Sequence, residues 1–312
     1  MQSLWMLLAS FLFAAMGVCV KLAAELYTTS EIVMYRGIMG AAMLFVLSRV
    51  RGDSMRTPLP WAHATRGVIG VTALWLWFYA IGRLPLAMSM TLNSMAPIWL
   101  AAILLGAAWW RGQGRLEWNC ALAVLASFGG VTLLLQPSMQ ASQWFAACVA
   151  LVSSMISALA YLQVRKLGQL GEPEYRVVFY FSVTGAVAGA LGNLATPWVA
   201  PGQIAWHGHT THGVLLLAGV GLCATAAQMA MTRAYRLGHP LVTANLQYTG
   251  IVFSSIWGIL LWSDALGWMG WLGIAIILAS GSAATYYNSR SRPAPVPTTV
   301  PAAGVDPVAA KS

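Results

Sequence analysis

Residues 80–87 read Ala-Ile-Gly-Arg-Leu-Pro-Leu-Ala, and they join two long apolar segments, 66–83 and 85–108. A related sequence, Ala-Tyr-Arg-Leu-Gly-His-Pro-Leu-Val at residues 234–242, joins two further apolar segments at a matching place later in the chain. Similar junctions at corresponding positions indicate an internal repeat, in which one unit of several helices occurs twice.

The rest of the chain has the same apolar character around these junctions. A helix that crosses a membrane needs about 20 mostly apolar residues. Ten segments meet this requirement, so we predict an all-α integral membrane protein with ten transmembrane helices. The segments are 3–24, 31–49, 66–83, 85–108, 117–135, 143–164, 175–195, 212–233, 240–262 and 265–287. The breaks fall at Gln136-Pro137-Ser138 and at Thr196-Pro197, where we expect loops.

The composition supports a membrane location. Of the 312 residues, 59% are hydrophobic and only 8% are charged, and the mean hydropathy is +0.70. Soluble domains carry about 25% charged residues because their surface faces water. The net charge of +9 is spread over short loops, without a basic helix or stripe, so we expect no nucleic-acid partner.

The basic residues predict an orientation. If the N-terminus is cytoplasmic, 14 of the 17 lysines and arginines lie in cytoplasmic segments, Arg66 among them, and only Lys21, Arg36 and Arg83 lie on the outer side. Cytoplasmic loops of membrane proteins carry such an excess. We therefore expect a multi-pass protein of the inner membrane with both termini cytoplasmic.

The repeat divides the chain into residues 1–137 and 138–288, followed by a tail, 289–312, whose Pro, Ala, Val and Thr residues predict disorder. Glu31 and Glu174 mark the start of the second span in each half. Because each unit has five helices, an odd number, the second copy must be inverted in the membrane. Inverted repeats are typical of transporters, whose halves rock about a central site.

The sequence resembles the drug/metabolite transporter superfamily, specifically its EamA-type permeases. The resemblance covers residues 4–287. It rests on the ten-span layout, on Leu84-Pro85-Leu86-Ala87 leading into a helix with Ala96-Pro97-Ile98, and on Glu31 followed by Arg36. It implies export or exchange of amino acids, other metabolites or drugs through a central cavity lined by both halves.

Polar and aromatic side chains within the spans are the candidate solute-binding residues, because such groups avoid lipid and collect at cavities or helix contacts. Hydrogen bonding between helices is the alternative for each Ser and Thr. The candidates are Trp75, Phe78, Tyr79, Thr91, Ser157, Tyr161, Thr225, Gln228, Asn245 and Tyr248, with Trp77 and Trp257 as further aromatic wall residues. Gly67, Gly70, Gly185, Gly189 and Gly192 are expected to let helices approach closely.

Charged groups and a proline are candidates for gating: Glu31, Arg36 and Pro97. Glu31 and Arg36 could neutralise each other, Arg36 could attract a carboxylate solute, or it could reach up to the membrane interface. All eight acidic residues lie at span ends or in loops, which disfavours a buried carboxylate relay for protons.

Other classes of protein are weighed against transport. An intramembrane enzyme would need acids, histidines or a nucleophile–base pair converging in a cleft, and we expect none. His207, His209 and His212 could bind zinc or copper, but they lie in a loop without a fixed fourth ligand, so no metal and no cofactor is predicted. The partners we expect are a small-molecule solute and membrane lipids, and a lipid flippase or a membrane scaffold remains the alternative function.

Overall fold

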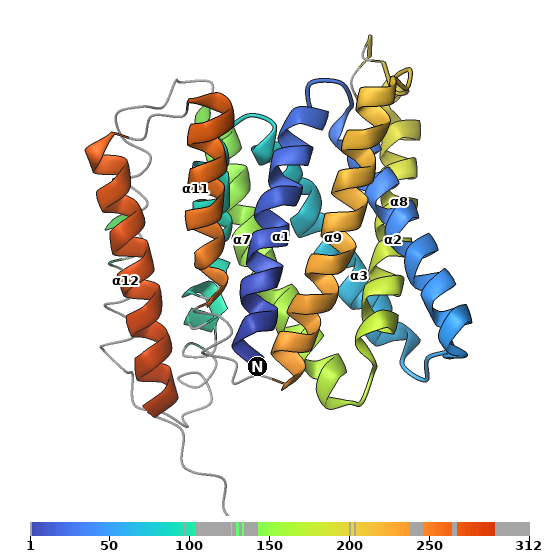
Figure 1. Cartoon of the computed structure of the whole chain (residues 1–312), viewed down its shortest axis with the longest axis horizontal. Helices are drawn as coiled ribbons and strands as arrows, with labels where there is room; N and C mark the ends of the chain where they lie inside the picture. Colours follow the sequence, from blue (N-terminus) through green and yellow to red (C-terminus); the bar gives the residue numbers. More distant parts are fainter. Residues whose placement is uncertain are drawn as a thin grey trace, which may run out of the picture.

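A computed structural model describes the residues 2–96, 98–100, 143–199, 201–202, 204–237, 246–263 and 267–290, together with a few isolated positions between 102 and 133. Every regular element among these residues is a helix (Figure 1). The elements are α1 (Gln2–Ala23), α2 (Thr29–Arg51), α3 (Pro60–Ile81), α4 (Leu86–Asn93), α7 (Trp144–Gln169), α8 (Glu174–Val199), α9 (Thr211–Leu237), α11 (Thr249–Trp262) and α12 (Trp268–Arg290).

Six of these helices are long and apolar enough to cross a membrane: α1, α2, α3, α7, α8 and α9. The helix α11 is a shorter apolar helix. Each overlaps a segment that the sequence predicts as a span. The predicted span 117–135 and the tail 289–312 fall almost wholly outside the described residues. The fold is therefore an all-helical, multi-pass membrane protein.

Local sequence explains where α2 and α3 begin. Thr28 and Glu31 form a capping box, in which each side chain bonds the backbone N–H of the other. Helix α3 begins at Pro60, six residues before the predicted start of its span, because a proline fits the first turn, where no N–H partner is needed. Arg66 therefore lies inside α3 and is 3% exposed, whereas the sequence analysis placed it in a cytoplasmic loop.

Two other boundaries differ from the prediction. Pro197 was expected in a loop, but α8 continues through it to Val199. Near a helix end a proline removes only one backbone hydrogen bond, and the side chain of Thr196 adds one by donating to Gly192 O at 3.1 Å. Helix α4 ends at Asn93, early in the predicted span 85–108, and the Ser94 hydroxyl bonds the carbonyl of Met90 there.

Helices α2 and α8 cross at glycines, as expected for residues 185–192. A Cβ at Gly189 would lie 2.5 Å from the backbone nitrogen of Met34, and one at Gly37 would overlap the backbone of Ala186. Side chains of Trp75 and Thr184 occupy the space beside Gly192 and Gly67. At Gly37 and Gly189 a Cβ would meet the backbone of the other helix and push α2 and α8 apart. Gly67 and Gly192 make the corresponding close contacts between α3 and α8.

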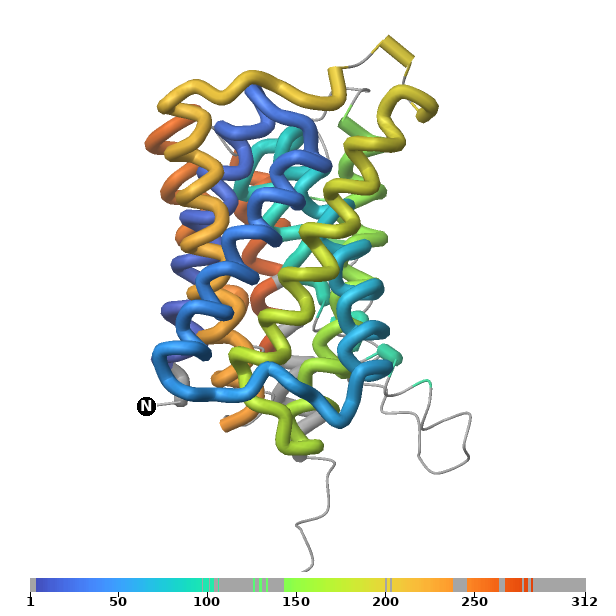
Figure 2. Tube along the Cα trace, turned by 90° about the vertical axis from the view of Figure 1, so that its right-hand side faces the viewer, coloured from blue at the N-terminus to red at the C-terminus, as the bar shows by residue number. Residues whose placement is uncertain are grey.

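The main helix pairs are α2 with α8, α1 with α9 and α3 with α7. All three pairs join helices from different halves of the chain, and α12 stands at one edge of the bundle beyond α11 (Figure 1). Figure 2 shows the two ends of the bundle. We call the end with the N-terminus and the loops 52–59 and 170–173 the N-terminal end. We call the end with the loops 24–28, 82–85 and 204–210 the histidine end.

Candidate functional site

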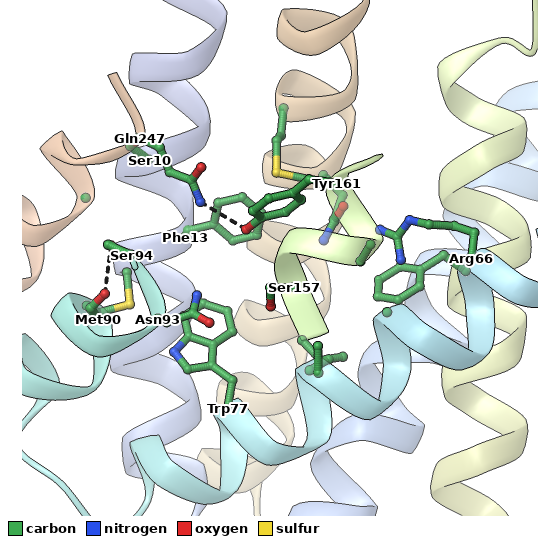
Figure 3. A pocket seen from close by; sticks show the side chains of 18 residues that line it. Ser10, Phe13, Arg66, Trp77, Met90, Asn93, Ser94, Ser157, Tyr161 and Gln247 are labelled. Carbon is green, nitrogen blue, oxygen red and sulfur yellow. Dashed lines mark hydrogen bonds between the residues drawn. The ribbon is translucent and has the colours of Figure 1, made fainter. Parts of the chain in front are cut away.

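A cavity of about 70 Å³ lies among α1, α3, α4, α7, α8, α9 and the start of α11. Helices from both halves of the chain form its wall, and Figure 3 shows how their side chains converge. We call it the central cavity. Its lining comprises Ser10, Phe13, Arg66, Gly70, Ala73, Leu74, Trp77, Met90, Asn93, Ser94, Ser157, Ala160, Tyr161, Phe181, Gln228, Met231, Gln247 and Gly250.

Several polar groups at the central cavity are buried without a hydrogen-bond partner among the described residues. They are the indole Nε1 of Trp77, the side-chain oxygen of Asn93, and Nε and Nη1 of Arg66. A buried polar group without a partner costs about 1–3 kcal/mol, and more when it is charged. The central cavity thus offers donors and an acceptor to whatever occupies it.

Other polar groups of the cavity are held in place. Gln247 donates from Nε2 to the hydroxyl oxygen of Tyr161 at 2.9 Å, as the dashed line in Figure 3 shows. The hydroxyl of Tyr235 donates to the other end of the same amide at 3.2 Å, and the rings of Tyr161 and Tyr235 stack with centroids 5.8 Å apart. This network fixes one wall of the cavity across α7, α9 and α11.

Three predicted solute-binding residues line the central cavity: Ser157, Tyr161 and Gln228. Trp77, named as an aromatic wall residue, lines it too, and its ring lies 6.4 Å from that of Phe13. Trp257, by contrast, packs against the apolar core next to the cavity. Tyr79 and Trp75 line a separate hollow of about 900 Å³ at the histidine end.

Four predicted residues lie away from the central cavity. Phe78 is 1% exposed and belongs to the apolar core. Thr91 bonds a carbonyl of its own helix, and Tyr248 packs in a second apolar cluster. Thr225 also bonds its own helix, and it lines an apolar groove between α2 and α9. Asn245 and Pro97 lie outside the described residues.

Glu31 forms the centre of a contact that closes the histidine end. Its carboxylate is fully buried and accepts hydrogen bonds from the backbone N–H of Thr28 and of His207, at 2.9 and 2.8 Å. The ring of His207 lies 2.7 Å away. His209 contacts the hydroxyls of Tyr27 and Tyr35, so the loop 204–210 is bound to α2 and to the residues before it. We call this set the Glu31 clamp.

The structure departs from two of the alternatives that the sequence left open for Arg36. Glu31 pairs with His207 and not with Arg36 in the described structure. Arg36 is only 2% exposed, so it does not reach up to the interface, and its guanidinium carbon lies 4.9 Å from the ring centroid of Phe181.

A second clamp lies at the N-terminal end, around Glu172 in the loop between α7 and α8. Glu172 is 3% exposed, and it accepts from the Thr57 hydroxyl at 2.6 Å and from Arg176 Nη1 at 2.9 Å. His63 Nε2 lies 3.4 Å from the carboxylate without hydrogen-bond geometry. We call this set the Glu172 clamp.

The electrostatics of the Glu172 clamp favour the charged carboxylate. Burial raises the pKa of the Glu172 carboxyl, but the hydrogen bonds from Thr57 and Arg176 and the nearby positive charge lower it more. Its pKa therefore lies below that of an ordinary glutamate, and the clamp stays ionic at neutral pH.

Sequence reasoning missed Arg66, Asn93 and Gln247 as cavity residues. Arg66 was counted with the cytoplasmic charges, because it stands at the first position of the predicted span 66–83. Its spacing from Gly70, one helical turn later, is a signal that a close reading could use, since the Arg66 guanidinium occupies the space where a Cβ of residue 70 would stand. The other two are polar residues next to or within apolar segments, which is the same signal that identified Gln228.

Fold and site together define a class: a polytopic helical membrane protein with a small, mostly apolar cavity between two sets of helices, lined by a few buried polar groups. The model of the EamA-like transporter family matches residues 1–136. The pseudopaline exporter CntI of Pseudomonas aeruginosa is 31% identical over 87% of this chain and 92% of its own length. The chain therefore belongs to the EamA-like transporter family, a family of transporters and not of enzymes.

Two further comparisons agree. The riboflavin transporter of Vibrio cholerae is 25% identical over 92% of this chain and 94% of its own length. A solved crystal structure with 18% identity superimposes with a TM-score of 0.65 and covers 93% of this chain and 98% of its own. At that identity the structural match establishes the fold alone. The resemblance to EamA-type permeases that the sequence indicated is confirmed.

Proposed function

We propose that this protein exports or exchanges small metabolites such as amino acids by alternating access, with the central cavity as the solute site. The observation that carries this proposal is the enclosed cavity whose buried donors and acceptor lack partners, because these groups need a ligand to complete them. The clamps at the two ends of the bundle are the natural candidates for gates, since each joins elements from different halves.

The helix contacts support the ten-helix inverted repeat that alternating access requires. In such a repeat, α1 corresponds to α7, α2 to α8, α3 to α9 and α4 to α11. The contact of α1 with α9 then has its counterpart in the contact of α7 with α3, and the contact of α2 with α9 has its counterpart in that of α8 with α3. All four contacts are present. The pairs α2–α8 and α4–α11 map onto themselves. Helix α1 runs toward the histidine end and α7 runs away from it, as inversion demands (Figure 2).

The loop charges support cytoplasmic termini. Most of the described basic residues lie at the N-terminal end, on the ends of α2, α7 and α9, the starts of α3 and α8 and the loop 52–59, whereas the histidine end carries Lys21 and Arg83. Helix α12 runs from the histidine end to the N-terminal end, so its last residue lies on the same side as the N-terminus (Figure 1). An excess of Lys and Arg marks the cytoplasmic side, so solute would enter the cavity from the N-terminal end during export.

A lipid flippase is the second candidate, and the groove between α2 and α9 favours it. This groove has a volume of about 650 Å³ and is lined almost wholly by apolar side chains, including Met43, Leu47 and Met229. An acyl chain would fit such a surface. The groove is separate from the central cavity, since the two have no lining residue in common.

Release of solute from liposomes tests the proposal. Protein is reconstituted into vesicles loaded with labelled L-phenylalanine, L-glutamate or riboflavin, and release is followed for the parent protein and for Gln228→Ala and Thr225→Ala. The first variant changes the central cavity and the second changes the groove on the same helix. We expect saturable release that falls about tenfold in Gln228→Ala, the effect of about 1.4 kcal/mol, and remains in Thr225→Ala.

A result that favours the flippase would contradict the proposal. Scrambling of a labelled phospholipid, lost in Thr225→Ala and kept in Gln228→Ala, with no release of any solute, would replace the metabolite transporter by a flippase. Protein-free vesicles provide the background rate for both measurements.

A further inference from the structure

Two arginines from different helices face one aromatic ring inside the bundle. The guanidinium carbon of Arg66 lies 4.3 Å, and that of Arg36 4.9 Å, from the ring centroid of Phe181. The two guanidinium carbons are therefore no farther apart than the sum of these two distances. Both side chains are buried, and Nε and Nη1 of each lack a hydrogen-bond partner among the described residues. Two positive charges therefore lie in one apolar environment, and each charge makes it less favourable for the other to be charged.

No acidic residue in the described part of the chain compensates these charges. The acids there are Glu25, Glu31, Asp53, Glu172 and Glu174. Three of them already have partners: Glu172 pairs with Arg176, Glu174 pairs with Arg236, and Glu31 lies in hydrogen-bond contact with His207. The other two, Glu25 and Asp53, lie in loops at opposite ends of the bundle. An arginine stays charged at any physiological pH, so within the described part of the chain these two positive charges have no counter-charge, and an anionic ligand would supply one.

The central cavity gives that ligand access to Arg66. Arg66, Phe181 and Gly70 all line it, and Figure 3 shows the Arg66 guanidinium at one side of the cavity. Gly70 has no side chain, which leaves the space that the guanidinium fills. Arg36 does not line the cavity and contacts the same ring, so it contributes charge without direct contact.

We propose that the central cavity binds the carboxylate group of an organic anion, with Arg66 as the contacting residue and Arg36 as a second charge behind Phe181. The inference rests on the proposed function, which it deepens by naming the charge class of the solute. A guanidinium presents parallel N–H groups that match the two oxygens of a carboxylate. The free indole N–H of Trp77 adds a further donor.

The remaining lining selects a carboxylate over a phosphate. Arg66 is the only cation among the described lining residues, and the rest are uncharged polar, thioether and aromatic side chains. One contacting guanidinium matches a singly charged carboxylate, whereas a phosphate monoester carries nearly two charges at pH 7 and requires more donors. The apolar lining from Phe13, Leu74 and Trp77 suits the hydrocarbon part of an amphipathic acid.

Thermal unfolding of the full-length protein in detergent tests this proposal without any transport step. The probes are sodium benzoate, its neutral isostere benzamide, and phenyl phosphate, each at pH 7.5 and at matched ionic strength with sodium chloride. A ligand that binds only the folded state raises the unfolding midpoint. We expect benzoate to raise it by about 3 °C or more, and benzamide to leave it unchanged.

Substitutions identify the residues. Arg66→Gln is expected to abolish the benzoate shift, Arg66→Lys to keep part of it, and Arg36→Gln to weaken binding about three- to tenfold. Without benzoate, Arg66→Gln is expected to be at least as stable as the parent protein, because it removes an uncompensated buried charge. Arg83→Gln, an exposed cation at the histidine end, is the control and should keep the full shift.

Several results would overturn the inference. One is an equal shift with benzamide, and another is a benzoate shift that survives in Arg66→Gln. The third is a strong loss of stability in ligand-free Arg66→Gln, which would mean that Arg66 already has an acidic partner. A shift with phenyl phosphate alone would make the site a phosphate site. Solute release in the vesicle assay with no anion effect on unfolding would leave transport standing and remove only the carboxylate.

Discussion

The two ends of the bundle are closed by the same device with different chemistry. At each end, a buried glutamate at the start of the second helix of one half binds a loop or helix of the other half. Glu31 binds the loop 204–210 between α8 and α9, and Glu172 binds the loop 52–59 between α2 and α3. An inverted repeat would predict such a correspondence, with Glu172 as the counterpart of Glu31. The sequence analysis matched Glu31 with Glu174, which lies two residues later.

The difference lies in how the contacts are distributed. The Glu31 clamp centres on one carboxylate, whose partner His207 belongs to the other half, and the remaining contacts of its loop are those of His209 with Tyr27 and Tyr35. In the Glu172 clamp the ion pair is local, because Arg176 follows Glu172 by four residues. The loop 52–59 is held by several further bonds, including Arg176 Nη2 to Ser54 O at 2.9 Å and Tyr180 to Met55 O at 3.0 Å. One substitution should therefore release the histidine end but not the N-terminal end.

The largest effect is expected from Glu31→Ala. The substitution leaves the N–H groups of Thr28 and His207 without an acceptor and removes one half of the capping box, so we expect the free energy of unfolding to fall by about 3 kcal/mol. Thermal unfolding in detergent measures the loss. His207→Ala is the matched control. It removes the ionic contact and keeps the backbone bond, so it should cost about 1 kcal/mol.

Accessibility tests the gate directly. A cysteine introduced at Trp75, which lines the hollow at the histidine end, should react faster with a membrane-impermeant maleimide in the Glu31→Ala background. Equal rates with and without Glu31→Ala would show that the clamp stabilises the fold but does not gate that end.

The sequence predicted much of the fold because hydropathy alone limits where helices can lie. It predicted less of the site, because polar residues on an apolar helix can face either a cavity or another helix. Gln228 and Thr225 lie three residues apart on α9, yet only Gln228 reaches the central cavity. The Glu31–His207 contact joins residues 176 positions apart, and no local pattern indicates such a pair.

Arg66 is a second residue whose place in the site the sequence could not predict. The sequence places it at the edge of a span, where an arginine is normally a topology signal. Its burial follows from the early start of α3 at Pro60 and from the space at Gly70. Only the packed structure reveals that this residue shares Phe181 with Arg36.

A smaller effect is expected from Glu172→Ala, and this variant sharpens the comparison. Arg176 keeps its bond to Ser54 O, and Tyr180 keeps its bond to Met55 O, so we expect a loss of about 2 kcal/mol in unfolding free energy. Thermal unfolding of the two alanine variants side by side measures the contrast. A larger loss for Glu172→Ala than for Glu31→Ala would reverse our view of which clamp depends on one residue.

The pH dependence of stability distinguishes the Glu172 clamp further. Because the pKa of Glu172 is lowered in the folded protein, its contribution is fully present above the pKa of an unfolded glutamate, about 4.3. The contribution is lost as pH falls through the lower folded pKa. The parent protein should be more stable than Glu172→Gln at pH 7, and this difference should shrink as the pH falls below the pKa of an unfolded glutamate. Unfolding midpoints between pH 3.5 and 7 measure this, and a difference that grows on acidification would contradict the lowered pKa.

The smallest effects belong to the exposed tyrosines that flank each clamp. Tyr35 bonds His209 Nε2 at 2.8 Å, and Tyr175 donates to Ser54 O at 3.2 Å. Both bonds are exposed, so water replaces them readily and each Tyr→Phe substitution should cost less than about 0.5 kcal/mol.

The two tyrosine substitutions nevertheless distinguish the two clamps when each is combined with a second substitution. Combined with His207→Ala, Tyr35→Phe removes two contacts of the same short loop, so the double variant should lose more than the two single variants together. Combined with Glu172→Gln, Tyr175→Phe should be additive, because Arg176 still holds the loop at Ser54. Unfolding midpoints of the two double-mutant cycles decide the matter, and additivity in both cycles would mean that the clamps share one distributed design.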